Sequence, residues 1–228
     1  MESTASEYFG RMVAEYDSLI RRSVPLYDTM IERLVTYLPQ GRRRVLELGC
    51  GTGNLSLRLA ERYPDAEVTL VDASPEMLAI TLARLAASGE SDPGRFRKHE
   101  APFEALGLEP ASFDLVTSCI SIHHVEDKGV LFAQLHDLLA PGGVLAYADQ
   151  MAGSNAAHSS INRGRWLDFC HEDGNCNQAE IESLVAHGEA HDFHASIFSQ
   201  LAAIDALGFE GTDVVWRNWM WGIVVAYR

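Results

Sequence analysis

The ten residues VLELGCGTGN, at positions 45–54, are the most informative in the chain. A short apolar run leads into three glycines, Gly49, Gly51 and Gly53, and a leucine-rich segment with helical spacing follows. Glycines at a strand-to-helix turn permit positive φ angles and let a ligand come close to the backbone. Asp72 ends the next apolar run, 23 residues after Gly49. At this spacing a carboxylate can accept both hydroxyls of a ribose, so the pattern indicates a nucleotide-type ligand.

Outward from this motif, strand and helix patterns alternate. We expect strands at 44–49, 66–72, 95–100, 113–119 and 144–149, and helices at 54–63, 74–87 and 128–139. Ser74-Pro75 is a typical helix start, and Pro141-Gly142-Gly143 is expected to separate the last helix from its strand. The alternation predicts an α/β fold with a mainly parallel sheet and helices on both faces.

The two flanks of the alternating region have other patterns. Residues 5–38 carry apolar side chains at helical spacing with an interruption near Ser23–Pro25, which predicts two consecutive helices. Residues 150–208 are predicted to be mostly helical. Two final strand candidates, 211–217 and 219–227, are joined by an expected tight turn at Arg217-Asn218 and predict an antiparallel hairpin.

The composition is that of a globular protein with an acidic surface. Of 228 residues, 47% are hydrophobic, and 18 basic against 32 acidic side chains give a net charge of −14. This charge disfavours nucleic acid and anionic membranes as partners. The four cysteines are scattered, and neither a signal-peptide pattern nor an apolar run of about 18 residues occurs. We therefore expect a reduced, cytoplasmic protein, and a homodimer stays open.

A glycine triplet alone would also fit a unit that binds a nicotinamide dinucleotide. Three details favour another class. Glu47 lies two residues before the first glycine, GCGTGN is one residue tighter than G-x-G-x-x-G, and the sheet is predicted to end in an antiparallel hairpin.

With these motifs the chain resembles the class I S-adenosylmethionine (SAM) dependent methyltransferases. VLELGCGTG resembles their first motif, and VTLVDASPEML (68–78), Glu100-Ala101, FDLVTSCISIHHV (113–125) and LLAPGGVLAYAD (138–149) resemble the segments that follow in order. The resemblance covers residues 45–149. It implies a three-layer, Rossmann-like sheet of seven strands in the order 3-2-1-4-5-7-6, SAM as cofactor and a small-molecule acceptor.

The same resemblance implies a single methyltransferase domain over residues 1–228. Its expected parts are an N-terminal helical lid (1–40), a SAM-binding core (41–150), a helical cap over the acceptor (151–207) and the C-terminal hairpin (208–228).

Individual positions receive expected roles from the resemblance. The glycine loop would approach the methionine half of SAM, Asp72 would hold the ribose, and Tyr16 would close over the methionine. The cofactor-binding residues implied in this way are Tyr16, Gly49, Cys50, Gly51, Asn54, Asp72, Ala73, Met77, Glu100, Ala101, Ser118 and Cys119. Of these, Ala73 and Met77 would pack on adenine, Glu100 and Ala101 would meet its edge, and Ser118 and Cys119 would lie under the sulfonium.

Histidines supply the candidate catalytic groups. His123 and His124 follow the fourth strand, where they would act as a base or position the acceptor, or else brace the loop. His191, with Asp192, is a candidate substrate contact in the cap. A metal interpretation of His171, His187, His191 and His194 is disfavoured because no compact ligand motif such as CxxC or HExxH is present, so no metal is predicted.

Two other functions stay open beside methyl transfer to a small molecule. One is an enzyme like carboxy-SAM synthase, which modifies SAM itself and would need arginines converging on the pocket. The other is a non-catalytic SAM-binding protein, against which the intact GCGTG motif and Asp72 argue. Trp166 in the cap is a candidate for lining the acceptor pocket, whereas Trp216, Trp219 and Trp221 are expected to pack the hairpin.

Overall fold

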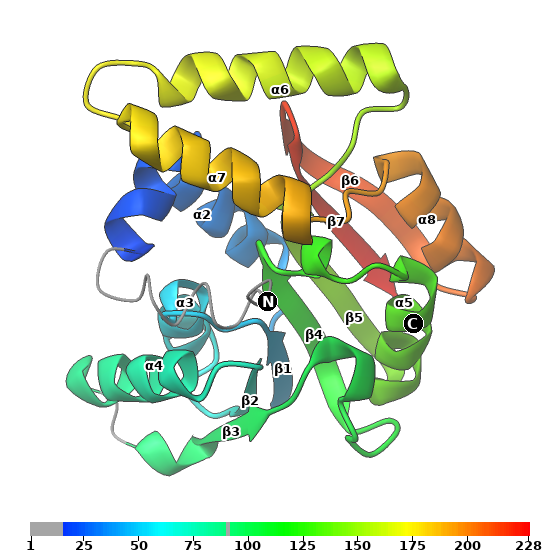
Figure 1. The fold of residues 1–228 in the computed structure, drawn as a ribbon. Coiled ribbons are helices and arrows are strands. Elements are labelled where there is room, and N and C mark those ends of the chain that lie inside the picture. Colours follow the sequence, from blue (N-terminus) through cyan, green and yellow to red (C-terminus); the bar gives the residue numbers. More distant parts are fainter. Residues whose placement is uncertain (1–15, 90–91) are drawn as a thin grey trace.

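The computed structural model describes residues 16–89 and 92–228. One seven-stranded sheet has the order β3-β2-β1-β4-β5-β7-β6 (Figure 1). Strands β1 to β5 pair in parallel, and β7 is antiparallel to both β5 and β6. The α/β class, the strand order and the C-terminal hairpin predicted above are thereby confirmed.

The strands are β1 (Arg44–Leu48), β2 (Glu67–Asp72), β3 (Phe96–Glu100), β4 (Phe113–Cys119), β5 (Leu139–Gln150), β6 (Glu210–Asn218) and β7 (Trp221–Tyr227). The α-helices are α2 (Tyr27–Tyr37), α3 (Asn54–Arg62), α4 (Pro75–Ala87), α5 (Lys128–Leu138), α6 (Ala156–Cys170), α7 (Gln178–His191) and α8 (Ile197–Ala206). Three short 3-10 helices are η1 (Pro93–Arg95), η2 (Phe103–Ala105) and η3 (Ile122–His124). A further helical segment covers 16–23.

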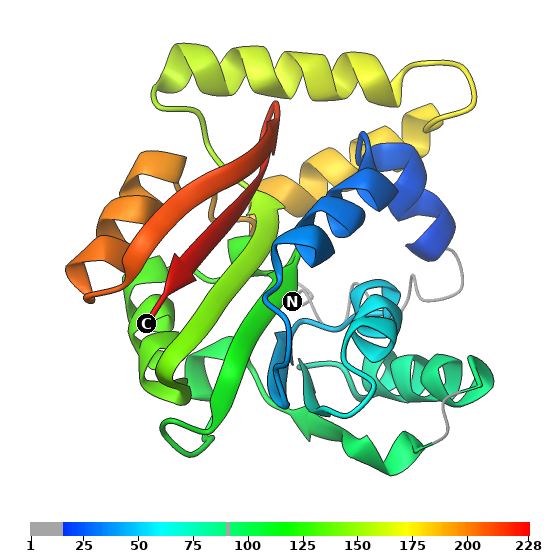
Figure 2. The same cartoon turned by 180° about the vertical axis from the view of Figure 1, so that it is seen from behind.

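Helices cover both faces of the sheet, as the two views show (Figures 1 and 2). Side chains alternate along each strand, so Val45 packs into one core with α2, α3 and α4, while Leu46 packs into the other with α5 and α8. The central strands β1, β4 and β5 are apolar on both sides because both sides are covered. No helix within the described ranges is long and apolar enough to cross a membrane.

Helices α6 and α7 lie beyond the carboxyl ends of the strands and not on a sheet face (Figure 1). They are fastened to the N-terminal helices: Arg22 makes a bidentate ion pair with Glu180 on α7, at 2.8 and 2.9 Å, and Trp166 on α6 donates to the Ser23 carbonyl at 2.9 Å. Helix α8 differs from the expected cap, because Ile197 packs into the core with α5 on a sheet face. Of the helices in the expected cap, α6 and α7 therefore cover the strand ends and α8 does not.

The N-terminal helices are interrupted at residues 24–26, where Leu26 has a φ of 61°. The predicted break next to Pro25 is confirmed, because a residue before proline disfavours helical geometry. The predicted helical positions 5–15 lie outside the described residues.

Two predicted boundaries were wrong. Strand β5 begins at Leu139 and not at 144, because Leu139 already pairs with Phe113 on β4 and Gly142 and Gly143 pair with the backbone of Arg228, although Gly142 has a φ of 74°. The hairpin turn lies at 219–220 and not at Arg217-Asn218, because Asn218 still pairs with Trp221 and it is Trp219 that takes the positive φ of the turn, 50°.

Candidate functional site

Two cavities lie side by side at the carboxyl ends of the strands. The first, of about 520 Å³, is lined by the loop after β1 and by the ends of β2 and β4. The second, of about 340 Å³, lies between the end of β5, the helix at 16–23, α6 and α7. Tyr16, Ile120 and His124 line both. Ligand sites of open α/β sheets are found at this edge, where the strand order reverses between β1 and β4.

The glycine loop forms one wall of the first cavity. Gly49, Gly51 and Gly53 have φ angles of 65°, 53° and 89°, a region in which other residues are strained. Gly49 is also required by packing, since a Cβ there would come within 2.4 Å of the Ser121 side chain. The loop therefore turns tightly enough to expose its backbone to the cavity.

Asp72 holds this loop from the tip of β2. Its two carboxylate oxygens accept the backbone N–H groups of Gly51 and Ser74, each at 2.9 Å. Burial raises the pKa of Asp72, although these backbone hydrogen bonds oppose the shift. Each oxygen keeps acceptor capacity for a ligand hydroxyl.

Glu47 is a second acid in the lining of the same cavity. It lies at the interior of the sheet, 1% exposed, and accepts a hydrogen bond from Ser56 at 2.6 Å. Burial raises the pKa of Glu47 to about 8, even though the Ser56 hydroxyl lowers it. At neutral pH this carboxyl is therefore mainly protonated.

The N-terminal helix is anchored to the glycine loop through Asp17. This carboxylate accepts hydrogen bonds from Thr52 and from Asn54 (3.1 Å), and it pairs with Arg84 at 2.8 Å. Tyr16 is thereby held at the opening shared by the two cavities.

The structure brings most of the expected cofactor residues into the lining of the first cavity, namely Tyr16, Gly49, Cys50, Gly51, Asn54, Asp72, Ala73, Met77 and Cys119. Three others are not in its lining. Glu100 is exposed and Ala101 is buried at the end of β3, whereas Ser118 is buried beneath the loop, with its hydroxyl on the Leu48 carbonyl at 3.0 Å.

Residues 102–104 line the first cavity close to where Glu100-Ala101 were expected. Phe103 offers an aromatic face there, and a search for an apolar residue just after the third strand would have found it. Ile120 and Ser121, after β4, complete this part of the lining.

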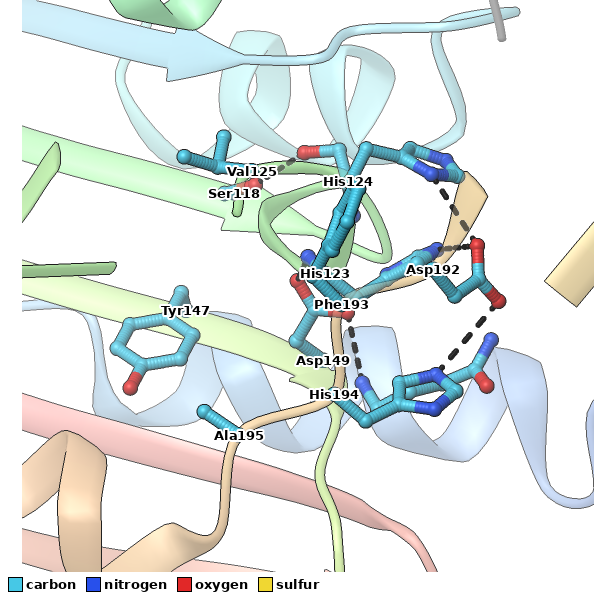
Figure 3. Close-up of polar contacts among 12 residues, drawn as sticks. Ser118, His123, His124, Val125, Tyr147, Asp149, Asp192, Phe193, His194 and Ala195 are labelled. Atoms are coloured by element: carbon cyan, nitrogen blue, oxygen red, sulfur yellow. Dashed lines mark hydrogen bonds and ion pairs between the residues drawn. The ribbon is translucent and has the colours of Figure 1, made fainter. Parts of the chain in front are cut away.

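The second cavity is apolar over most of its wall and also has polar side chains in its lining. Leu19, Ile20, Val24, Met151, Trp166, Leu184, Val185, Met220 and Trp221 form the apolar part. Trp166 lies where it was predicted, and Trp221, expected only to pack, also contacts the cavity. Its polar lining includes His123, His124, His187, Asp192 and His194, which we call the His–Asp cluster. Figure 3 labels four of these five residues, all except His187.

The His–Asp cluster joins the loop after β4 to the segment after α7. His123 donates from Nδ1 to Asp149 Oδ1 at 2.5 Å, and both side chains are buried. Burial lowers the pKa of His123, but the adjacent carboxylates of Asp149 and Asp192 outweigh it and raise that pKa. His191 is absent from both cavity linings: its carbonyl contacts His124 Nδ1 at 3.4 Å, and its ring packs against that of His187 with the centroids 5.0 Å apart.

Lys128 holds together the two backbone segments that carry this cluster. Its ammonium group donates to the carbonyl oxygens of His123, Val125 and Phe193, the last at 2.8 Å. Phe193 in turn donates its N–H to the His123 carbonyl at 2.8 Å. The two segments that carry the histidines are therefore bonded to each other through their backbones.

A doubly wound sheet with a glycine loop, an acid after β2 and an acid-lined cavity defines a protein that binds a nucleoside cofactor at this edge. Comparison with known proteins identifies the family. A model described as "Methyltransferase domain" matches residues 45–143. The chain is 32% identical to trans-aconitate 2-methyltransferase of Streptomyces avermitilis, over 79% of this chain and 69% of that protein.

Two further comparisons agree. Demethylmenaquinone methyltransferase of Thermus thermophilus is 38% identical over 47% of this chain and 47% of its own length. A structure of phosphoethanolamine N-methyltransferase 2 from Haemonchus contortus in complex with SAM has the same fold, with a TM-score of 0.66 and 20% identity, and covers 92% of this chain and 44% of that one. The chain belongs to the class I SAM-dependent methyltransferases, as the motifs implied.

Proposed function

We propose that this methyltransferase transfers the methyl group of SAM to a small molecule bound in the 340 Å³ cavity beneath α6 and α7. The observation that supports this most directly is that Tyr16, Ile120 and His124 line both cavities. A cofactor in one cavity and an acceptor in the other would meet at these three residues. Such juxtaposition, with water excluded, provides much of the acceleration of a displacement reaction.

The first cavity fits SAM by size and chemistry. Its volume of about 520 Å³ is in the range of cofactor sites, and it combines three acids, Glu47, Asp72 and Glu104, with apolar walls. Asp72 would accept the ribose hydroxyls, Met77 and Phe103 would enclose the purine, and the glycine loop would lie along the methionine half. When bound, SAM supplies an electrophilic methyl group on a cationic sulfur.

The second cavity supports a compact, largely apolar acceptor with one polar group. Its hydrophobic wall would hold the body of the acceptor, and the His–Asp cluster would face the group that receives the methyl. The related enzymes named above are called after trans-aconitate and demethylmenaquinone, both small molecules. Arg163 is the one arginine in either described lining, and it pairs with Glu189, so the converging arginines of a carboxy-SAM-synthase-like site are not found there.

Blocking the second cavity tests this assignment. Val185 on α7 lines it, whereas its neighbour Ala186 is exposed. We expect Val185→Phe to abolish methyl transfer or raise the KM for the acceptor at least tenfold, because the ring occupies acceptor space. The affinity for SAM should stay within twofold, and Ala186→Phe should behave as the parent protein.

The acceptor for this test would come from mass spectrometry of small molecules that copurify with the protein, followed by assay of S-adenosylhomocysteine release. Equal turnover in Val185→Phe and the parent enzyme would place the acceptor elsewhere.

Cofactor binding should release a proton from Glu47. Its pKa of about 8 in the free protein keeps the carboxyl protonated at pH 7, and a cation in the same cavity lowers that pKa. At most about 0.9 proton would leave per SAM bound at pH 7. Calorimetry in two buffers with different ionisation enthalpies measures this number, and Glu47→Gln should reduce it. An unchanged release in Glu47→Gln would assign the proton to another group.

A further inference from the structure

We propose that the His–Asp cluster is a binding site for a divalent first-row transition metal ion, with His123, His124 and Asp192 as ligands. One nitrogen or oxygen from each of these residues lies within 4.8 Å of the others. The ligands come from η3 and from the residue after α7, and these two segments lie side by side (Figure 3) where they line the second cavity. The site would exist whether or not the proposed acceptor assignment is correct.

The spacing of the donor atoms is the main argument. Asp192 Oδ1 lies 3.2 Å from His124 Nδ1, 3.7 Å from His123 Nε2 and 3.9 Å from His187 Nε2. The two longer separations exceed hydrogen-bond distances. Ligands bound to zinc at about 2.0–2.1 Å in a tetrahedron are about 3.3 Å apart. Small movements would therefore suffice to place a metal ion between these atoms.

Burial makes the arrangement costly without an ion. The Asp192 side chain is 7% exposed, and among the described residues its Oδ1 atom makes no hydrogen bond of acceptable geometry. Buried carboxylate oxygens normally have a donor, since desolvation without compensation is expensive. His194 Nε2 contacts the other oxygen, Oδ2, at 3.6 Å, which leaves Oδ1 as the oxygen directed at the ligand nitrogens.

The surroundings of His123 resemble the outer shell of a metal site. Metal-binding histidines commonly donate their second ring N–H to a carboxylate, which orients the ring. His123 does so through Nδ1 to Asp149, and its Nε2 then faces Asp192. The Lys128 and Phe193 contacts hold the backbone of both ligand segments. The ligands are thereby positioned in advance.

The donor set indicates the kind of ion. Two imidazoles and one carboxylate suit Zn²⁺, Fe²⁺, Co²⁺ or Ni²⁺, whereas Mg²⁺ and Ca²⁺ prefer oxygen ligands. Because all three residues line the second cavity, the remaining coordination positions would open towards it. If the proposed function holds, an oxygen of the acceptor would occupy such a position beside the methyl donor, since His124 also lines the cofactor cavity.

Titration with Co²⁺ tests the site directly. Protein freed of metal with EDTA should bind one equivalent, with visible absorption bands that Zn²⁺ abolishes by competition. Asp192→Asn and His123→Ala should weaken Co²⁺ binding at least 100-fold, and Asp149→Asn about 10- to 100-fold. His171→Gln is the matched control, because His171 is exposed at the end of α6 and lies outside the cluster. Circular dichroism of each variant confirms that it is folded.

The proposal is overturned if folded wild-type protein binds neither Co²⁺ nor Zn²⁺ at 1:1 stoichiometry. It is equally overturned if Asp192→Asn binds as tightly as His171→Gln. If methyl transfer continues in EDTA, the metal ion has no role in binding the acceptor, and the proposed function is unaffected. If the protein binds the metal ion but Val185→Phe keeps full activity, the metal site stands and the placement of the acceptor in the second cavity is wrong.

Discussion

Replacement of Asp72 by alanine should weaken SAM binding about 10- to 100-fold, which corresponds to about 1–3 kcal/mol. The variant removes the acceptor that faces the first cavity from β2. It also leaves the N–H groups of Gly51 and Ser74 without their present partner, so the glycine loop loses the contact that shapes it. Loss of the ribose acceptor and loss of support for the glycine loop should both reduce the affinity for SAM.

Isothermal calorimetry with SAM measures this change. Asp65→Ala is the matched control, because Asp65 is an exposed acid in the turn before β2 and is absent from the lining of either cavity. An unchanged dissociation constant in Asp72→Ala would remove the ribose assignment. Binding of a nicotinamide dinucleotide in preference to SAM would contradict the cofactor role of this cavity as a whole.

His124→Gln should lower turnover about 10²- to 10⁴-fold while the dissociation constant for SAM stays within twofold. His124 lies at the junction of the two cavities and is oriented by Asp192 at 3.2 Å. Under the proposed function, a group at this position would act on the acceptor, directly or through a bound ion, and would make few contacts that the cofactor needs. Its loss should therefore appear in kcat and not in cofactor affinity.

Release of S-adenosylhomocysteine with the copurified acceptor gives kcat, and calorimetry gives the SAM affinity of the same preparation. His171→Gln serves again as the control. If His124→Gln lost SAM binding as well, His124 would belong to the cofactor site and the acceptor would be held by other groups.

Much of the fold was accessible from local sequence patterns. The strands at 113–119 and around 44–48 were predicted to within a residue, because buried parallel strands are short apolar runs bounded by turn residues. The boundary of β5 was not, since its first residues belong to the sheet through pairing with Phe113 and with Arg228 at the other end of the sequence. The hairpin turn was displaced for a similar reason: cross-strand pairing of Asn218 overrides its own preference for a turn.

Most of the lining of the first cavity could also be predicted from the sequence, because its residues follow the ends of successive strands. Gly49, Asp72 and Cys119 each lie at the carboxyl end of a parallel strand, and parallel strands bring these ends to one edge. Glu100 was expected there by the same rule, yet it is exposed, and Phe103 lines the cavity. Strand position alone does not specify which residue of a following loop turns inward.

The amino-acid sequence by itself determined the sheet, the glycine turn and the position of Asp72 in the first cavity, since each depends on residues close together in the chain or on the order of the strands. Only the tertiary structure decided the His–Asp cluster. His123 and His124 are more than sixty residues from His187 and Asp192, and no local spacing relates them. Their meeting depends on how the end of α7 packs against the loop after β4, where Lys128 and Phe193 join the two backbones.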